Sequence, residues 1–258
     1  MAEFPIIEIK GVSKVFTLQD QTIHALADAN LAIRKGEFVC LIGASGCGKS
    51  TLLRIMAGFE QPSLGEALMW GKPIEEPEPS RGMVFQDYAL FPWLSVRDNI
   101  GFGPVARGLS RGEVKATVDK FIELVGLQKF ATAYPHQLSG GMKQRVAIAR
   151  VLANDAELVL MDEPFGALDA MTRERLQDEL LEIWQRTGLT VVFVTHSVEE
   201  AIFLAGRVVV MTPGPGRIES DNALELPRPR DVSSPEFNDI RRALSAKLHS
   251  HHGKKVTA

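Results

Sequence analysis

Short runs of apolar residues recur along the chain and alternate with segments whose apolar residues are spaced three or four positions apart. Each run is rich in branched side chains and too short for a helix, so it predicts a buried strand. Strands without a polar face, separated by helices, favour a mostly parallel sheet that helices cover on both sides. The predicted strands are Phe38–Ile42, Met83–Phe85, Leu158–Met161, Val191–Val194 and Val208–Met211.

Helical spacing is clearest over residues 114–125, where apolar side chains fall on one face. Ser110 and Glu113 precede this segment and predict a capping box, in which each side chain accepts a hydrogen bond from the other residue's backbone N–H. Similar spacing predicts a helix that runs toward Gly188, and Ser197 is typical of a third helix start.

Two regions depart from this alternation. Residues 1–35 and about 62–76 have the pattern of short strands and turns, which predicts a small antiparallel sheet beside the main one. Residues about 87–150 are helical without an obvious strand, which predicts an inserted helical subdomain. We therefore expect a single α/β domain over residues 1–220, followed by a short C-terminal extension over residues 221–258.

The extension contains a proline-arginine run at 227–230 (Pro-Arg-Pro-Arg), and a short helix is predicted near Pro235–Leu248. The last residues have the composition of a frayed tail. Its histidines, His249, His251 and His252, either contact a metal or are solvated. The lack of a carboxylate or cysteine nearby in the sequence favours solvation.

Composition narrows the classes of function. The chain has 258 residues, a formal net charge of -3 and 45% hydrophobic residues, which predicts an ordered globular protein with one large domain. This charge argues against a protein that binds nucleic acid over its whole surface. No apolar run approaches the ~18 residues that span a bilayer, and no signal peptide is evident. Cys40 and Cys47 are too few for a disulfide framework, which favours a reducing cytosol.

A phosphate-binding loop is predicted after the strand Phe38–Ile42. Its glycines let the backbone approach phosphates, while free N–H groups and the positive end of the following helix, Thr51–Ala57, face the anion. Lys49 is expected to reach the terminal phosphates, Ser50 to ligate Mg²⁺, and Thr51 to donate to a phosphate oxygen. Kinases, GTPases and transport motors share this motif. The residues that fit the pattern G-x-x-x-x-G-K-[ST] are Gly43, Ala44, Ser45, Gly46, Cys47, Gly48, Lys49 and Ser50.

Two carboxylates follow the predicted strand Leu158–Met161. Ligands of open α/β sheets bind at the carboxyl ends of the strands. Asp162 is therefore predicted to hold Mg²⁺, directly or through water, and Glu163 to act as general base on the attacking water. The alternative is that two acidic residues only end a strand, and the phosphate loop elsewhere in the chain argues against it.

Residues 138–145 predict a capped helix start, with Ser139 as N-cap before Gly140 and Gly141. A hydroxyl and free N–H groups at a helix start form a second anion site. The segment resembles the LSGGQ signature of ATP-binding cassette (ABC) proteins, with Met142 where glutamine is usual. In that family this site meets the γ-phosphate bound by the partner subunit.

Further positions match ABC landmarks in the expected order, and their roles are those that the resemblance implies. Gln86 matches the glutamine that senses Mg²⁺ and the attacking water, and His196 matches the switch histidine at the γ-phosphate. Residues 166–169 look like the D-loop. The resemblance implies that Asp169, the last of them, lies at the nucleotide. Phe16 occupies the position of the aromatic that stacks on adenine, and core packing is the alternative for its ring.

The resemblance covers about residues 6–220 and implies a P-loop NTPase with a RecA-like, mostly parallel sheet, a small antiparallel β subdomain and an inserted α-helical subdomain. It implies an ATPase that uses ATP and Mg²⁺ and binds each ATP between two copies of the chain. Closure of the dimer then depends on ATP, and hydrolysis releases it. The extension is too short for a separate regulatory domain.

Three segments, 91–94, 162–170 and 211–218, look like the nitrate, sulfonate and taurine importer branch. This branch implies a peripheral subunit on the cytoplasmic face of the inner membrane that energises uptake of a small anionic solute. Integral membrane permease subunits are expected to dock near Gln86–Val96, although the aromatic residues there could instead form a subdomain core. A periplasmic or extracellular solute-binding protein takes part indirectly, and no nucleic acid is expected. The alternatives are a soluble ABC ATPase of DNA repair or translation, and a P-loop kinase or GTPase.

Overall fold

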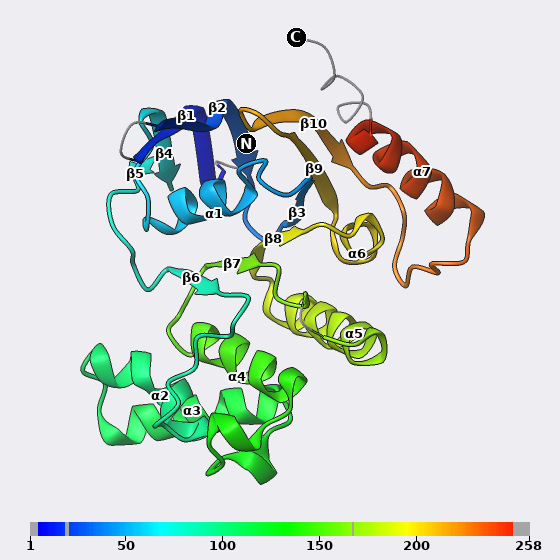
Figure 1. The fold of residues 1–258 in the computed structure, drawn as a ribbon. Helices are drawn as coiled ribbons and strands as arrows, with labels where there is room; N and C mark the ends of the chain where they lie inside the picture. The colour runs from blue at the N-terminus through cyan, green and yellow to red at the C-terminus, as the bar shows by residue number, and fades with distance from the viewer. Residues whose placement is uncertain (1–4, 19–20, 167, 250–258) are drawn as a thin grey trace. The chain divides into compact units, whose positions relative to one another are not determined.

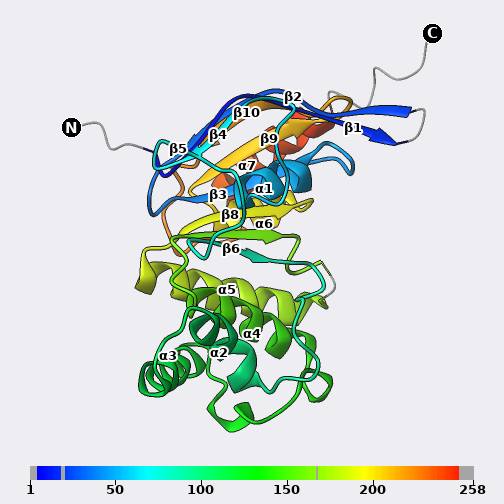
Figure 2. The same ribbon diagram turned by 90° about the vertical axis from the view of Figure 1, so that its left-hand side faces the viewer.

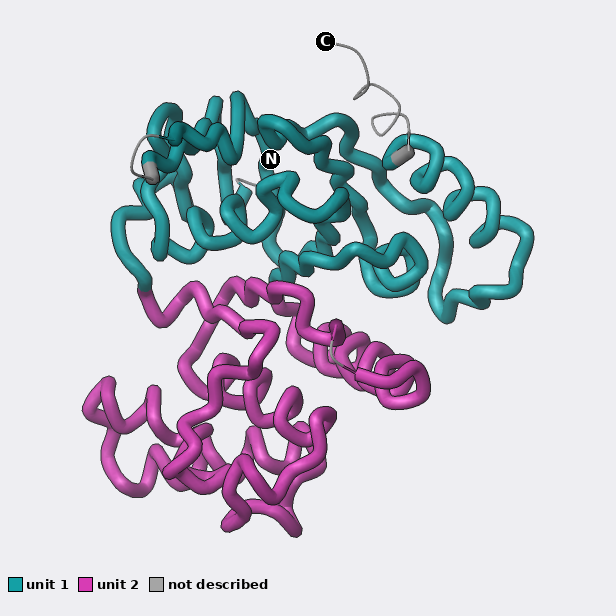
Figure 3. The backbone as a smooth tube through the Cα atoms, in the orientation of Figure 1, with its two compact units in different colours: residues 1–77, 190–258 teal, residues 78–189 magenta. Residues whose placement is uncertain are grey.

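The computed structural model describes residues 5–18, 21–166 and 168–249. The chain forms two compact units, residues 1–77 with 190–258 (unit 1) and residues 78–189 (unit 2) (Figure 3). Ala167 of the predicted D-loop and the tail histidines His251 and His252 lie outside the described residues, as does the side chain of His249. The predicted division at residue 220 stays a prediction.

Unit 1 contains a mostly parallel sheet in the strand order β10-β9-β3-β8 (Figure 1). Strand β3 pairs in parallel with β8 and β9, and β10 pairs antiparallel to β9. Every residue of β3 and β8 is buried, which explains why the pattern shows no polar face. The strands are β3 (Phe38–Gly43), β8 (Thr190–Thr195), β9 (Arg207–Thr212) and β10 (Arg217–Ala223).

A second, antiparallel sheet of unit 1 has the order β2-β1-β4-β5 (Figure 2). The sequence prediction of an antiparallel piece is confirmed, but the prediction that its strands are short is wrong for β1 and β2, which have 12 and 13 residues. Their pairing contains register shifts between residues 9 and 15, and such bulges interrupt the two-residue alternation. The strands are β1 (Ile7–Leu18), β2 (Gln21–Ile33), β4 (Leu64–Met69) and β5 (Lys72–Pro73).

Three helices complete unit 1. Helix α1 (Lys49–Ala57) contacts strands of both sheets and ends at Gly58, which has a left-handed backbone conformation. Helix α6 (Val198–Leu204) packs on β3 and β8, and helix α7 (Pro235–His249) packs on α6 and β9. The predicted cap at Ser197 is confirmed, because its hydroxyl accepts a hydrogen bond from the Glu200 N–H at 3.2 Å.

Unit 2 combines two parallel strands with a group of helices. The predicted strand Met83–Phe85 is displaced, because Arg81 and Gly82 pair with β7 while Phe85 leaves the strand. The Ser110–Glu113 capping box is confirmed at the start of α3. The elements are β6 (Arg81–Val84), α2 (Val96–Ala106), α3 (Arg111–Leu124), the 3₁₀ turns Gln128–Phe130 and Pro135–Gln137, α4 (Gly140–Leu152), β7 (Leu158–Asp162) and α5 (Ala170–Thr187).

Helix α4 lies against α2, α3, α5 and strand β6, so it is the central helix of unit 2. Within the ranges that the structure describes, no helix is both long enough and apolar enough to cross a bilayer.

Candidate nucleotide-binding site

The loop between β3 and α1 has the backbone geometry that the phosphate-loop pattern predicts. Gly46 and Gly48 have φ angles of +77° and +86°, which side chains other than glycine rarely adopt. Helix α1 begins after Gly48 without a side-chain cap. The first N–H groups of a helix lack partners within it, so this helix start can bind an anion.

Close packing explains two of the loop's glycines. A Cβ atom on Gly43 would lie 2.5 Å from Cys47 Sγ and 2.6 Å from the Met211 carbonyl oxygen. A Cβ atom on Gly48 would lie 2.6 Å from Leu26 Cδ2. The loop is therefore shaped by direct contact with β9 and β2.

The turn between β9 and β10 supports the same loop. Gly216 N–H donates to the Ala25 carbonyl at 3.1 Å, and Ala27 N–H donates to the Gly216 carbonyl at 2.9 Å. A Cβ atom on Gly216 would lie only 2.2 Å from the Cys47 carbonyl oxygen. By sequence pattern, Pro213–Gly216 is only a tight turn, whereas the structure places its end against the phosphate loop.

Lys49 is buried, with 6% of its surface exposed. Its Nζ donates to the carbonyl oxygens of Gly43 at 2.8 Å and Ala44 at 3.1 Å, and lies 3.7 Å from Cys47 Sγ. Burial raises the pKa of the Cys47 thiol, although nearby Lys49 opposes this shift. The groups that hold the Lys49 ammonium are neutral and do not offset its positive charge. Phosphate oxygens can therefore pair with this charge. The loop thus fits a nucleoside triphosphate.

Unit 1 also contains Phe16 and His196. Phe16 lies on β1 opposite Ile23 of β2, is partly buried, and has Lys14 Nζ 4.9 Å from its ring centroid. The ring is therefore neither fully exposed nor part of the fully buried core. His196 is exposed directly after β8, before the N-cap of α6.

In unit 2, the residues that follow β6 and β7 lie close to one another. Strand β7 ends at Asp162, and Glu163 has a φ angle of +46°. Such a conformation costs about 1–3 kcal/mol for a residue with a side chain and is concentrated at functional sites. A Cβ atom on Gly166 would lie 3.4 Å from the Glu163 carbonyl oxygen and 3.6 Å from Gln86 Nε2. The structure therefore brings Gln86 to the segment that carries Glu163.

The predicted signature forms the start of α4. Exposed Ser139 is the N-cap, and its Oγ accepts a hydrogen bond from Met142 N–H at 3.3 Å. A Cβ atom on Gly140 would lie 2.9 Å from Leu168 Cδ2, and one on Gly141 would lie 3.2 Å from Thr172 Cγ2. The two glycines let this helix start lie close to Leu168 and to α5.

Asp169 has a structural role that the sequence reasoning missed. Its carboxylate caps α5 by accepting a hydrogen bond from Thr172 N–H at 3.0 Å, and the bonds from Thr172 lower the pKa of Asp169. The signal is present in the sequence, because an aspartate before a helical segment is a common N-cap. Contact of Asp169 with nucleotide stays a prediction.

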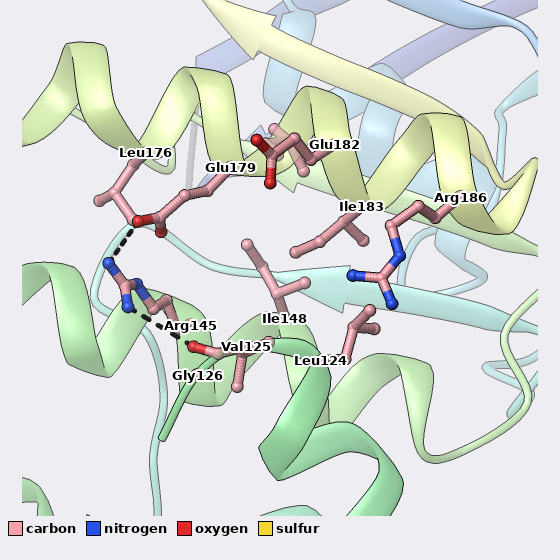
Figure 4. A pocket seen from close by; sticks show the side chains of 11 residues that line it. Leu124, Val125, Gly126, Arg145, Ile148, Leu176, Glu179, Glu182, Ile183 and Arg186 are labelled. Carbon is pink, nitrogen blue, oxygen red and sulfur yellow. Dashed lines mark hydrogen bonds and ion pairs between the residues drawn. The ribbon is translucent and has the colours of Figure 1, made fainter. Parts of the chain in front are cut away.

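Two arginines of α4 were also missed. Arg150 donates to the carbonyl of Ala89, in the segment that follows Gln86, at 2.5 Å. Arg145 donates to Glu179 of α5 at 2.5 Å and to the Val125 carbonyl at 3.5 Å (Figure 4). Arg145 also lines a cavity of about 180 Å³ between α3, α4 and α5, which none of the predicted site residues line. These bonds fix α4, which begins at the predicted signature, to other segments of unit 2.

An aromatic surface follows Gln86. Trp93 is 70% exposed, and its ring centroid lies 5.7 Å from that of Phe91, which lies 4.5 Å from that of Phe102. Fully buried Asn99 holds this segment, since its side chain bonds to both backbone groups of Phe91 and to the Leu94 carbonyl. The segment thus combines a buried anchor with exposed rings.

The family model described as ABC transporter matches residues 26–166. A nitrate import ATP-binding protein of Synechococcus elongatus is 49% identical over 89% of this chain and 86% of its own length. A taurine import ATP-binding protein of Roseobacter denitrificans is 48% identical, over 84% of this chain and 82% of its own. An aliphatic sulfonates import ATP-binding protein of Bacillus cereus is 46% identical, over 92% of this chain and 93% of its own.

Solved structures are similar as well. One is a dimeric ATP-binding cassette in a post-hydrolysis state with ADP and Pi bound; it is 32% identical, with a TM-score of 0.75 over 85% of this chain and 99% of that one. Another is cbiO1 from Clostridium perfringens, part of the ABC transporter complex cbiONQ; it is 30% identical, with a TM-score of 0.78 over 97% of this chain and 100% of that one.

Proposed function

The chain belongs to the ABC transporter family of ATPases, and from this premise we propose that it hydrolyses ATP to drive uptake of a small anionic solute through separate membrane subunits. The phosphate loop is the observation that carries the nucleotide assignment. Gly46 and Gly48 have positive φ angles, α1 begins without a side-chain cap, and Lys49 is buried. These features match the shape and charge of a triphosphate. Phe16 is the candidate to stack on the adenine ring.

Oxygen ligands support a role for Mg²⁺. Ser50, Asp162 and Gln86 carry the oxygen donors that this ion prefers, and we assign them to hold it. In the described part of the chain, no group of three or more His, Cys, Asp or Glu residues could hold a metal. Mg²⁺ is usually bound by one or two carboxylates together with phosphates, so the donor set fits. When bound, this ion neutralises charge on the transferred phosphoryl group.

Three residues are assigned to the hydrolytic step. Glu163 accepts a proton from the attacking water, and Gln86, close to the same segment, orients that water. His196 donates a hydrogen bond to the γ-phosphate.

A second copy of the chain is the proposed partner at the nucleotide. The start of α4 presents the exposed Ser139 and the backbone of Gly140 and Gly141 as donors for a γ-phosphate held by the other copy. Asp169, at the start of α5, is assigned to the same surface. The similar cassette solved as a dimer with ADP and Pi supports this arrangement.

The aromatic surface around Trp93 is the proposed docking site for the membrane permease subunits. Tryptophan is enriched among the residues that contribute most to binding at protein interfaces, and buried Asn99 fixes the backbone of this segment. We propose that the docked chain is a peripheral subunit at the cytoplasmic face of the inner membrane. A solute-binding protein acts on the other side of the membrane and makes no contact with this chain.

The names of the import relatives support nitrate, taurine or another sulfonate as the solute class. The chain should be purified together with candidate permease and solute-binding proteins and reconstituted in vesicles. We expect ATP-dependent uptake of one of these labelled solutes, and no uptake with Lys49→Ala. ATP hydrolysis without association or uptake would contradict the transport proposal.

A matched pair of variants tests the docking surface in the same system. Trp93→Ala should weaken co-purification with the permease and leave ATP hydrolysis by the isolated chain unchanged. Phe130→Ala, which removes another exposed ring of unit 2, is the control and should co-purify normally. Equal retention of both variants on the permease would place the contact elsewhere.

A further inference from the structure

The proline-arginine run of the C-terminal extension contacts the short helix that follows His196. Helix α6 has only seven residues, too few for a stable helix without tertiary support. Helix α7 packs against α6 in Figure 1 and buries Phe237 and Leu244. The extension is therefore part of the structure that holds α6.

Arg230 binds the C-terminal end of α6 directly. Its Nη1 donates to the Ile202 carbonyl and, at 2.5 Å, to the Ala205 carbonyl. Arg228 donates to the Leu204 carbonyl. The last carbonyls of a helix lack partners within it and form the negative end of its dipole, so arginine side chains satisfy both the hydrogen bonds and the charge.

This arginine is buried, with 8% of its surface exposed. Burial, helped by nearby Arg228, lowers the pKa of Arg230 to about 10, so the guanidinium remains charged at neutral pH. Its Nε also donates to the Leu226 carbonyl at 3.0 Å. Loss of such a side chain leaves several buried carbonyls without a donor, which is unfavourable.

The opposite end of α6 is fixed next to His196. Ser197 N–H donates to Thr195 Oγ1 at 3.0 Å, and Ser197 Oγ accepts from Glu200 N–H at 3.2 Å. His196 therefore sits between a fully buried strand and a helix whose far end is bound by Arg230.

We propose that Arg230 is a positioning residue for His196, acting through α6. This inference rests on the proposed role of His196 at the γ-phosphate. The proline-arginine run then has a function in ATP hydrolysis. The reason is that a small displacement of α6 moves the segment that carries His196. Displacements of about 1 Å can reduce catalysis by as much as about 10²-fold.

The test compares variants of the full chain in ATP hydrolysis and in hydrogen exchange. Arg230→Met keeps a side chain about as long as the aliphatic part of arginine but removes its donors. It should lower kcat about tenfold, change the KM for ATP by less than about twofold, and speed exchange in peptides covering 196–205. Arg230→Lys should recover part of kcat. Arg242→Ala is the control, because that exposed side chain pairs with Asp239 of its own helix, and it should change neither measurement.

Combination with His196→Ala separates positioning from general destabilisation. If Arg230 acts through the histidine, Arg230→Met should cause no further loss of kcat in the His196→Ala background. Wild-type kcat in a folded Arg230→Met protein, or an equal loss with and without the histidine, overturns the inference. Should Arg230→Met not fold, Arg230→Lys must show the same dependence on His196. If His196→Ala hydrolyses ATP at the wild-type rate, the proposed role of His196 has failed instead.

Discussion

The three glycines of the phosphate loop allow conformational strain to be separated from steric conflict by single alanine substitutions. Gly46 has φ +77°, and no atom of the described residues would lie within 4 Å of an added Cβ, so Gly46→Ala adds strain alone. Gly43 lacks a positive φ, but its Cβ would meet the Met211 carbonyl oxygen at 2.6 Å. Gly48 has both problems, with φ +86° and the Ala25 carbonyl oxygen at 2.7 Å.

The expected losses of unfolding free energy follow from these contacts. A left-handed backbone costs a residue with a Cβ about 1–2 kcal/mol, so Gly46→Ala should lose about that amount. Overpacking costs about 1–3 kcal/mol, which is the expectation for Gly43→Ala. The two costs together give about 2–5 kcal/mol for Gly48→Ala.

Urea unfolding of the full chain without nucleotide, followed by far-UV circular dichroism, measures these differences. The dependence of unfolding free energy on urea should stay constant, so that midpoints report stability. Gly48→Ala should be the least stable of the three variants. If Gly46→Ala is as unstable as Gly48→Ala, the steric contacts around Gly48 add no cost to the strain of its backbone, which refutes the expected order.

Three further predictions concern catalysis and a helix cap. Glu163→Gln should bind ATP, hydrolyse it far more slowly and accumulate as a dimer in gel filtration; wild-type turnover would exclude Glu163 as the base. A mixture of Lys49→Ala and Ser139→Arg chains should retain one intact composite site per mixed dimer in nucleotide-binding titrations, and retention of neither or both would contradict a shared site. Ser110→Ala should lower the unfolding free energy by about 1 kcal/mol in urea titrations, since it removes the capping box of α3; an unchanged midpoint would mean that this cap adds no stability.

Local patterns were sufficient to predict much of the fold. The apolar run at Phe38–Ile42 and the capping signals at Ser110 and Ser197 describe contacts that depend on few neighbours, and the structure contains each of them. The length of β1 was not predictable in this way, because its bulges break the alternation. Strand β6 was displaced because Arg81 and Gly82 become strand residues by pairing with β7.

The candidate site shows the same division. Short motifs predict the phosphate loop, the two carboxylates and the signature, because each is a contiguous stretch of residues. The support of these motifs is not contiguous. Gly216 reaches the loop from a turn that lies far along the chain, and Arg230 binds carbonyl groups 25 and 28 positions earlier. The spacing of apolar residues along the sequence does not predict such long-range contacts.

The hydrogen bonds of Lys49 affect the entropy cost of binding a phosphate. Its ammonium group finds its acceptors, the Gly43 and Ala44 carbonyls, within the loop itself. These contacts hold the ammonium group in place. A side chain that is held in place loses less conformational entropy when it binds a phosphate, so less of the interaction energy is spent on ordering it.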